Sequence, residues 1–267
     1  MMESEEAFPI PGIPDFWERV RRAPRKHLAL DYDGTLAPFR VERMRAVPLD
    51  GVIDCLASIS RRPDTILVII SGRPVDEILD LVGDIGLTVV GSHGWEVRAA
   101  DGSRCGMTPS AAQERRLRRA EREVRKRGLE SRAERKVASL AVHTRGLSGG
   151  TAEEIESELV RLWEADAPRA GLAPRRFDGG VELRAAGIDK GTILDDLLRD
   201  EPEDTFCVYV GDDETDEDAF RAIRGRGVGI KVGPEDAATH AAGRLPDCRA
   251  VLDFLRRWSH SAGLRGT

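Results

Sequence analysis

The sequence lacks the features that would suit a membrane protein, a secreted disulfide scaffold or a zinc site. No run of about 18 apolar residues occurs, so no membrane span and no membrane partner are expected. The N-terminal residues are acidic and broken by proline, whereas a secretory signal has a basic stretch followed by an apolar one. There is no CxxC pair among the cysteines, which are Cys55, Cys105, Cys207 and Cys248. We therefore expect a cytoplasmic protein with free thiols and no zinc.

The charge gives no reason to expect a nucleic-acid partner. The chain carries 41 basic and 47 acidic residues, a net charge of -6. Residues 114–127 are strongly basic, but their Glu and Arg side chains recur four positions apart, as in an exposed helix stabilised by ion pairs. A phosphate-binding or nucleic-acid-binding role for this segment is the less favoured alternative. No interface pattern stands out, and we expect a monomer.

Apolar runs rich in β-branched residues alternate with helical patterns, which predicts an α/β fold with a largely parallel sheet covered on both faces. The expected strands span residues 27–30, 65–70, 87–90, 138–143, 205–210 and 227–232. The expected helices span residues 49–61, 74–82, 110–128, 151–165, 189–199 and 214–224.

The middle of the chain has a different pattern. Residues 103–182 contain a basic helix, a strand, a second helix and a further strand after a Gly-Gly turn. This order predicts a small α+β unit inserted into the α/β domain. The insertion would split that domain into residues 1–102 and 183–267.

Four polar clusters are expected at one edge of the sheet. They are residues 31–35, 71–73, the single Lys190 at a helix start, and 212–218. Ligands of open α/β sheets bind beyond the carboxyl ends of the strands, where clusters on adjacent parallel strands would converge. Each cluster alone is an ordinary turn; their order and shared position indicate a site.

Two carboxylates directly after a buried strand suit phosphoryl transfer. A phosphate monoester is a dianion that repels an attacking carboxylate, and Mg²⁺ binds both carboxylate and phosphate oxygens. Asp31 can act as the nucleophile and form an aspartyl-phosphate. The chain turns at Gly34, so Asp33 can reach the leaving oxygen as general acid and later serve as base, while its carbonyl faces the metal. The alternative is a turn in which the Asp side chains only bind the backbone.

The remaining clusters supply the other groups that this reaction needs. Ser71 can donate a hydrogen bond and Lys190 a positive charge to the phosphoryl oxygens. Asp212 and Asp213 can complete the metal site together with Asp31 and Asp33. Asp216, one helical turn further on, can support these ligands from behind. Acidic residues also favour a helix N-terminus, which is the structural alternative for this segment.

In this order, DYDGT, SGR, a Lys before a helix, and GDDETDED resemble the four motifs of the haloacid-dehalogenase-like phosphatases. The resemblance covers most of the two flanking segments. It implies a Rossmann-like core, Mg²⁺ as cofactor and the same roles for the residues named above. It also implies that the insertion is the larger α+β cap found in one subgroup.

Longer segments are similar to trehalose-6-phosphate phosphatases: GSHGWEVR (91–98), KVASLAVHTR (136–145), VELRAAGIDKG (181–191) and GDDETDEDAF (211–220). This resemblance implies hydrolysis of trehalose 6-phosphate, with sugar contacts from both the core and the cap. The implied substrate-binding residues are Thr35, Arg73, His93, Gly94, Glu96, Lys136, His143, Arg145, Glu182 and Arg184.

Several alternatives stay open from the sequence. The substrate could be another phosphorylated sugar, such as sucrose phosphate or a glycosyl-glycerate phosphate. The chain could also be a catalytically silent domain that binds a sugar phosphate, although all the reacting groups are present. A mutase that transfers phosphate to another acceptor is less favoured. Trp95 is either a platform for a sugar ring or a core residue.

Overall fold

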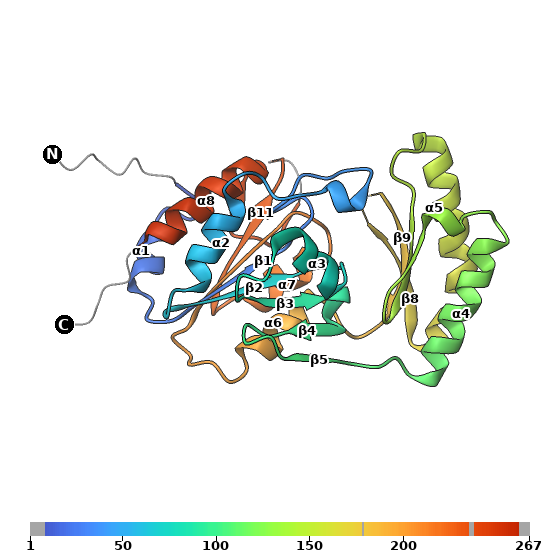
Figure 1. The fold of residues 1–267 in the computed structure, drawn as a ribbon, viewed down its shortest axis with the longest axis horizontal. Coiled ribbons are helices and arrows are strands. Elements are labelled where there is room, and N and C mark those ends of the chain that lie inside the picture. Colours follow the sequence, from blue (N-terminus) through green and yellow to red (C-terminus); the bar gives the residue numbers. More distant parts are fainter. Residues whose placement is uncertain (1–8, 178, 235–237, 262–267) are drawn as a thin grey trace.

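The computed structural model describes residues 9–177, 179–234 and 238–261. Its strands form two sheets, and Figure 1 shows the larger sheet on one side and the smaller one with α4 (Ala111–Arg125) and α5 (Gly149–Glu164) on the other. The predicted α/β fold with a parallel core sheet and an inserted α+β unit is confirmed. We call the smaller sheet with its two helices the cap, and the rest the core. Within the described residues, no helix is long and apolar enough to span a bilayer.

The core sheet has eight strands in the order β12-β11-β10-β1-β2-β3-β4-β5. The strands from β12 to β3 pair in parallel, and β4 and β5 are antiparallel additions at one edge. Their bounds are β1 Lys26–Leu30, β2 Thr65–Ile70, β3 Thr88–Gly91, β4 Glu96–Arg98, β5 Arg104–Gly106, β10 Phe206–Gly211, β11 Gly227–Val232 and β12 Gly243–Leu245. Every residue of β1 and β10 is buried, as expected for central strands with both faces covered.

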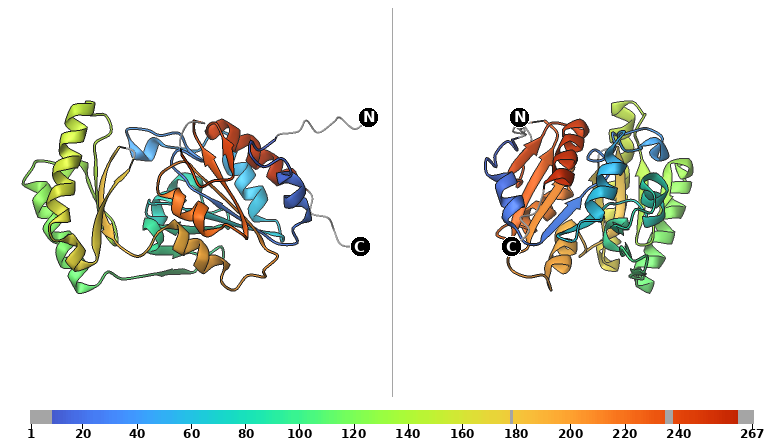
Figure 2. Two further views of the ribbon diagram at one scale, coloured as in Figure 1. Left: turned by 180° about the vertical axis from the view of Figure 1, so that it is seen from behind. Right: turned by 60° about the vertical axis from the view of Figure 1, so that its left-hand side comes forward.

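Helices cover both faces of this sheet because its central strands carry apolar side chains on both faces. In β1, Leu28 and Leu30 pack on one face, whereas Ala29 packs on the other. The first face is covered by α1 (Phe16–Arg22), α2 (Val52–Ser60), α3 (Val75–Val82) and α8 (Cys248–His260). The second face is covered by α6 (Lys190–Leu198) and α7 (Asp216–Ala222). In Figure 2, α1 and α8 lie at the end of the core away from α4 and α5.

The cap sheet is antiparallel, with strand order β6-β7-β9-β8. Its strands are β6 Ala133–Arg135, β7 Ser139–His143, β8 Leu172–Phe177 and β9 Gly180–Ala185. One face is apolar: Leu140, Val142 and Leu183 are buried with Leu117 of α4 and Trp163 of α5. Because side chains alternate along a strand, the neighbouring positions form the opposite, polar face.

Cross-strand pairing places charged residues in one row of that polar face. Glu134 pairs with Ala141, Ala141 with Glu182, and Glu182 with Arg175. Residues directly opposite each other point to the same side of a sheet. The row therefore presents two carboxylates and one guanidinium from three different strands to the core.

The basic segment of the cap is the exposed part of α4. Arg118 Nε donates to Glu114 at 2.7 Å, and Arg119 Nε donates to Glu123 at 2.9 Å, one turn along the helix. Leu117 lies on the buried side. Paired charges outside and an apolar stripe inside make this an ordinary exposed helix.

The two sheets do not divide at residues 103 and 182. The predicted boundaries assign β5 to the cap, although it pairs with β4 in the core sheet. They also cut through β9, which pairs with β7 up to Arg184. Neither boundary has the change in composition that marks a linker, so the sequence does not indicate where the two sheets separate.

Each predicted strand and helix is present, with ends that differ by a few residues. The elements missed were α1, α8, β4, β5, β6, β8 and β12. Five of these are strands: β4, β5, β6 and β12 have only three residues each, and β8 contains Pro174 and two arginines, so none shows a clear apolar pattern. By contrast, α8 carries Val251, Leu252, Leu255 and Trp258 at helical spacing and could have been predicted.

Candidate active site

A buried cluster of carboxylates lies beyond the carboxyl ends of β1 and β10. Oxygen atoms of Asp31, Asp212 and Asp216 all lie within 4.8 Å of one another. Lys190, the first residue of α6, donates to Asp31 Oδ1 at 2.7 Å and to Asp216 Oδ1 at 2.6 Å. Tyr209 Oη also donates to Asp216 Oδ1, at 2.6 Å. One lysine thus faces three carboxylates.

The cluster is short of positive charge. Burial and the neighbouring carboxylates raise the pKa of Asp31 to about 7 and the pKa of Asp212 to about 9, against the opposing effect of Lys190. Burial lowers the pKa of Lys190, but Asp216 and Asp31 together raise it above its ordinary value. All the donor atoms are oxygens, and Lys190 does not offset all of the negative charge of the carboxylates. Such a set of groups fits a hard divalent cation.

Gly34 lets the chain pass close to the cluster. Its φ is +75°, and a Cβ there would lie 2.0 Å from Asp212 Oδ2. The next residue, Thr35, donates from Oγ1 to Asp212 Oδ1 at 3.5 Å. The DGT part of the first motif therefore supports Asp212, 177 residues further along the chain.

Asp33 lies apart from the cluster, in an ion pair with Arg73. Arg73 donates from Nε to Asp33 Oδ2 and from Nη2 to Asp33 Oδ1, both at 2.7 Å. The Arg73 guanidinium lies over the Tyr32 ring and also donates to the carbonyl of Arg43 at 3.0 Å. Ser71 accepts a hydrogen bond from the Arg73 backbone N–H.

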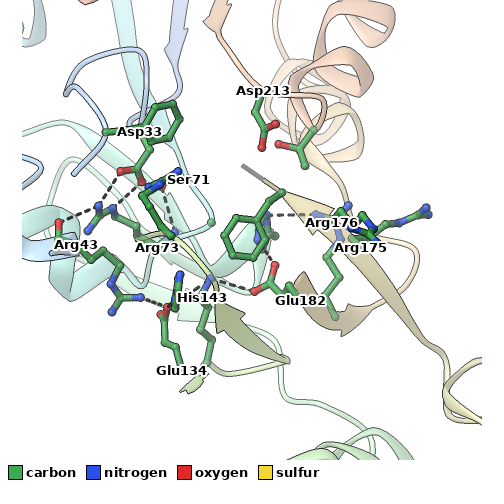
Figure 3. A pocket seen from close by; sticks show the side chains of 18 of the residues that line it. Asp33, Arg43, Ser71, Arg73, Glu134, His143, Arg175, Arg176, Glu182 and Asp213 are labelled. Atoms are coloured by element: carbon green, nitrogen blue, oxygen red, sulfur yellow. Dashed lines mark hydrogen bonds and ion pairs between the residues drawn. The ribbon is translucent and has the colours of Figure 1, made fainter. Parts of the chain in front are cut away.

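A cavity of about 560 Å³ lies between this edge of the core and the polar face of the cap. Figure 3 shows Asp33, Ser71 and Asp213 on the core side, with Glu134, His143 and Glu182 on the cap side. Asp31 and Lys190 also line the cavity. The reacting groups and the cap face therefore share one space.

Glu182 organises the centre of the cap wall. Its carboxylate accepts from Ser139 Oγ at 2.7 Å and Lys136 Nζ at 3.0 Å, and it lies 2.8 Å from His93 Nε2 of the core. Burial alone would raise the pKa of Glu182. The interactions with Lys136 and His93 lower it by a larger amount, so the pKa of Glu182 lies well below its usual value. Burial also lowers the pKa of His93, whose other ring nitrogen lies 3.4 Å from Arg184.

Another part of the cavity wall is lined by the rings of His143, Phe177 and Phe39 and by the Arg145 side chain. His143 Nε2 lies 2.9 Å from Glu134 Oε2, and burial with nearby cations lowers the pKa of His143 to about 4. Phe177 meets the His143 ring edge to face. The Arg145 guanidinium lies 4.5 Å from the ring centre of Phe39. This part of the wall offers flat faces as well as hydrogen-bond donors.

The structure brings most, but not all, of the expected residues to the cavity. Expected sugar contacts that line it are Arg73, His93, Lys136, His143, Arg145, Glu182 and Arg184. Expected contacts that do not line it are Thr35, Gly94 and Glu96.

The residues away from the cavity have structural partners. Glu96 accepts a hydrogen bond from Ser92. Gly94 has a φ of +98°, and a Cβ there would lie 2.8 Å from Ile188. Trp95 is buried with the cap core, so the core alternative holds for it. This turn places His93 on the cavity wall, whereas Gly94 and Glu96 do not line the cavity.

Of the expected metal ligands, Asp213 lies outside the carboxylate cluster, and Asp33, expected through its backbone carbonyl, contributes no carboxylate to it. Asp213 lines the cavity, and its Oδ1 accepts from the backbone N–H of Glu214 at 2.7 Å. Asp216, expected only to support the ligands, contributes a carboxylate to the cluster. It also accepts the Asp213 backbone N–H at 2.8 Å, so one residue shapes both the turn and the cluster.

Sequence reasoning also missed several lining residues: Phe39, Arg40, Val41, Arg43, Arg132, Glu134, Arg175, Arg176 and Phe177. Glu134, Arg175 and Phe177 lie on β6 and β8, the cap strands that were not predicted. Pairing these strands with β7 and β9 would have placed Glu134 and Arg175 beside Glu182.

A family model described as trehalose-phosphatase matches residues 29–246. The chain belongs to the trehalose-phosphatase family. A probable trehalose-phosphate phosphatase of Oryza sativa is 31% identical over an alignment 259 residues long, which covers 85% of this chain and 68% of that protein. A bifunctional trehalose-6-phosphate synthase/phosphatase of Thermoproteus tenax is 31% identical over 88% of this chain.

The fold of this trehalose-phosphatase family member agrees with that of solved structures. The C-terminal domain of C. albicans trehalose-6-phosphate phosphatase superposes with a TM-score of 0.83 at 21% identity, covering 96% of this chain and 99% of that one. The chain spans only 32% of the length of the Thermoproteus relative. This family member therefore corresponds to a part of some of its relatives.

Proposed function

We propose that this chain is a phosphatase that hydrolyses trehalose 6-phosphate to trehalose and phosphate, with Mg²⁺ as cofactor. The carrying observation is the carboxylate–lysine cluster of Asp31, Lys190, Asp212 and Asp216 at one side of a cavity that the polar cap face encloses. Membership of the trehalose-phosphatase family supports the same reaction.

Asp31 attacks the phosphorus in the first step. Lys190 binds Oδ1 of Asp31, so we assign the attack to Oδ2. The bond between phosphorus and the sugar oxygen breaks, and the leaving oxygen takes a proton from Asp33. In the second step water attacks the aspartyl-phosphate, Asp33 takes a proton from that water, and the carboxylate of Asp31 is released. Ser71 and Lys190 hold the phosphoryl oxygens.

Asp31, Asp212 and Asp216 are the residues we propose for holding Mg²⁺, with Asp213 nearby on the cavity wall. When bound, Mg²⁺ neutralises the phosphate dianion and stabilises the charge that develops in the transition state. The raised pKa values of Asp31 and Asp212 support this assignment, because a cation would keep both carboxylates ionised.

The cap wall recognises the sugar. Glu182 is held by Lys136 and Ser139, and its other neighbour is His93 of the core, so core and cap meet at this carboxylate. Buried, fixed polar groups discriminate strongly among hydroxyl patterns, because a poorly matched sugar leaves them without partners. Enclosure by the cap also excludes bulk water from the reacting phosphate.

The experiment is phosphate release from trehalose 6-phosphate, sucrose 6-phosphate, glucose 6-phosphate and p-nitrophenyl phosphate, with Mg²⁺ and with EDTA. We expect Mg²⁺-dependent release with a strong preference for trehalose 6-phosphate. Preference for another sugar phosphate would refute the substrate but keep the chemistry. No release from any of them would favour a silent binding domain.

We also propose a core and a cap as two domains of one monomer that works in the cytoplasm. The division follows the two sheets, with the connections at residues 107–110 and 186–189. Sedimentation of the purified chain tests the monomer, and fractionation of cells tests the compartment.

A further inference from the structure

A continuous series of contacts joins the general acid to the cap. Asp33 is bound by Arg73, and Arg73 Nη2 donates to the backbone carbonyl of Arg43 at 3.0 Å. The Arg43 side chain then forms an ion pair with Glu134 on β6 of the cap. Figure 3 shows these four residues in this order, from Asp33 to Glu134.

Arg43 is fixed from both sides. It lies in the short 3-10 turn η1 (Arg43–Arg45), in the connection between β1 and α2. One side of its guanidinium binds Glu77 of α3 in the core, and the other binds Glu134 in the cap. Its side chain is only 30% exposed. A planar guanidinium suits such a bridge, because its donors can engage two carboxylates at once.

Glu134 depends on Arg43 for its charge partner. Lys136 Nζ lies 4.0 Å from Glu134 Oε1 and is also engaged by Glu182 at 3.0 Å. His143 lies 2.9 Å from Glu134, but its lowered pKa of about 4 leaves it neutral near pH 7. The side chain of Glu134 is 13% exposed. Without Arg43, the largely buried carboxylate of Glu134 would rely on the more distant Lys136 and on the neutral His143.

We propose that Arg43 is a positioning residue that holds the cap against the core and links the cap position to Asp33. The link runs through the Arg43 carbonyl to Arg73, which grips both oxygens of Asp33. When the cap contact forms, η1 is held in place and Arg73 stays where it can deliver Asp33 to the leaving oxygen. When the contact is lost, η1 moves and Asp33 loses its support. This inference rests on the proposed phosphatase function.

The neighbouring Arg45 provides a matched control. It lies in the same turn, but its side chain is 76% exposed, and among the described residues its one ion pair is with the exposed Glu42. Arg45→Gln thus removes the same charge from the same turn without touching the cap. Surface pairs of this kind contribute little.

The test compares Arg43→Gln, Glu134→Gln, the double variant and Arg45→Gln, with trehalose 6-phosphate and p-nitrophenyl phosphate as substrates. We expect Arg43→Gln and Glu134→Gln each to lower kcat/KM for trehalose 6-phosphate about tenfold to a hundredfold, since each removes one partner of a part-buried ion pair. The double variant should lose no more than the worse single variant, because both act through one contact. Arg45→Gln should stay within about twofold of the wild type on both substrates. In the Arg43 and Glu134 variants, the first step on p-nitrophenyl phosphate, measured as the burst of p-nitrophenol, should be lowered much less than the first step on trehalose 6-phosphate, because its leaving oxygen needs no proton.

A second cycle tests the link to Asp33. Asp33→Asn should cost less kcat in the Arg43→Gln background than in the wild type, because the acid is already misplaced there. Additive losses in either cycle would overturn the proposal. Equal losses in the first step on p-nitrophenyl phosphate would also overturn it, since they would show a general structural defect.

Amide hydrogen exchange without substrate gives a readout independent of turnover. Residues 40–46 and 133–143 should exchange faster in Arg43→Gln than in the wild type, whereas Arg45→Gln should match the wild type. Unchanged exchange would refute the contact. If the wild type does not prefer trehalose 6-phosphate, the proposed function fails, and the exchange result still decides whether Arg43 holds the cap.

Discussion

Replacing Gly34 by Ala should impair metal binding far more than it impairs folding. The new methyl group would lie 2.0 Å from Asp212 Oδ2, well inside van der Waals contact, and Asp212 must move. Gly34 also has a φ of +75°, which an L-residue adopts only at a cost. Two effects are therefore combined at this position, backbone strain and displacement of a carboxylate.

Gly86→Ala separates the two effects. Gly86 has a φ of +71°, and nothing lies within 4 Å of a Cβ placed there. Both variants should lose about 1 kcal/mol of folding stability to the left-handed backbone. For a chain of this size that corresponds to a fall in Tm of about 2–4 °C. Only Gly34→Ala should disturb the carboxylate cluster.

The assay is phosphate release as a function of Mg²⁺ concentration, with thermal unfolding measured in EDTA. Displacing a group that holds a metal typically costs tenfold to a hundredfold in metal affinity, so the Mg²⁺ concentration for half-maximal rate should rise about tenfold or more in Gly34→Ala. Gly86→Ala should match the wild type. Equal Mg²⁺ dependence of the two variants would refute the placement of Asp212 beside Gly34.

Three further predictions concern the acid, the sugar contact and the pH dependence. Asp33→Asn should lower the rate of the first step about 10²–10⁴-fold on trehalose 6-phosphate but much less on p-nitrophenyl phosphate, whose leaving oxygen needs no proton; equal losses in the first step would argue against acid catalysis. Glu182→Ala should raise KM for trehalose 6-phosphate about tenfold or more through the loss of a buried hydrogen-bonded charge, with little change for p-nitrophenyl phosphate; equal changes would make Glu182 structural. In EDTA, Tm should fall as the pH rises from about 7 to about 9, above the range in which the buried histidines titrate, because the folded pKa of Asp212, about 9, lies above its unfolded value and the folded state must release a proton that the unfolded state has already lost. Mg²⁺ should remove this fall, and an identical slope with and without Mg²⁺ would contradict the assignment.

The fold class could be predicted from the sequence because central parallel strands are buried on both faces. The segments that became β2 and β10 are almost entirely apolar, which few other elements require. Their carboxyl ends share one edge in any parallel sheet, so the convergence of Asp31 and Asp212 followed from the topology alone. Lys190 begins α6, which follows β9 of the cap, and only the structure brings it to this edge. The short strands β6 and β8 carried no such signal, and the lining residues on them were missed.

The role of individual carboxylates could not be read from spacing. Asp213 directly follows Asp212, but its backbone N–H binds Asp216, and the carboxylate in the cluster is that of Asp216. Asp33 was expected beside the metal through its carbonyl and near the leaving oxygen through its carboxylate. Its carboxylate is bound by Arg73, 40 residues away, a partner that the spacing did not indicate. A turn after a strand leaves side-chain direction undetermined, and the partner that decides it lies elsewhere in the chain.

The sequence by itself determined the core of this protein: the apolar strands, the order of the polar clusters and hence the edge at which they meet. Periodicity and residue type suffice for these because burial of a strand and charge at its end are local properties. Only the tertiary structure decided how the cap meets the core. The contacts of Glu134 with Arg43 and of Glu182 with His93 join segments about 90 residues apart. Such pairs depend on the docking of one sheet against another, and no local pattern in the chain specifies them.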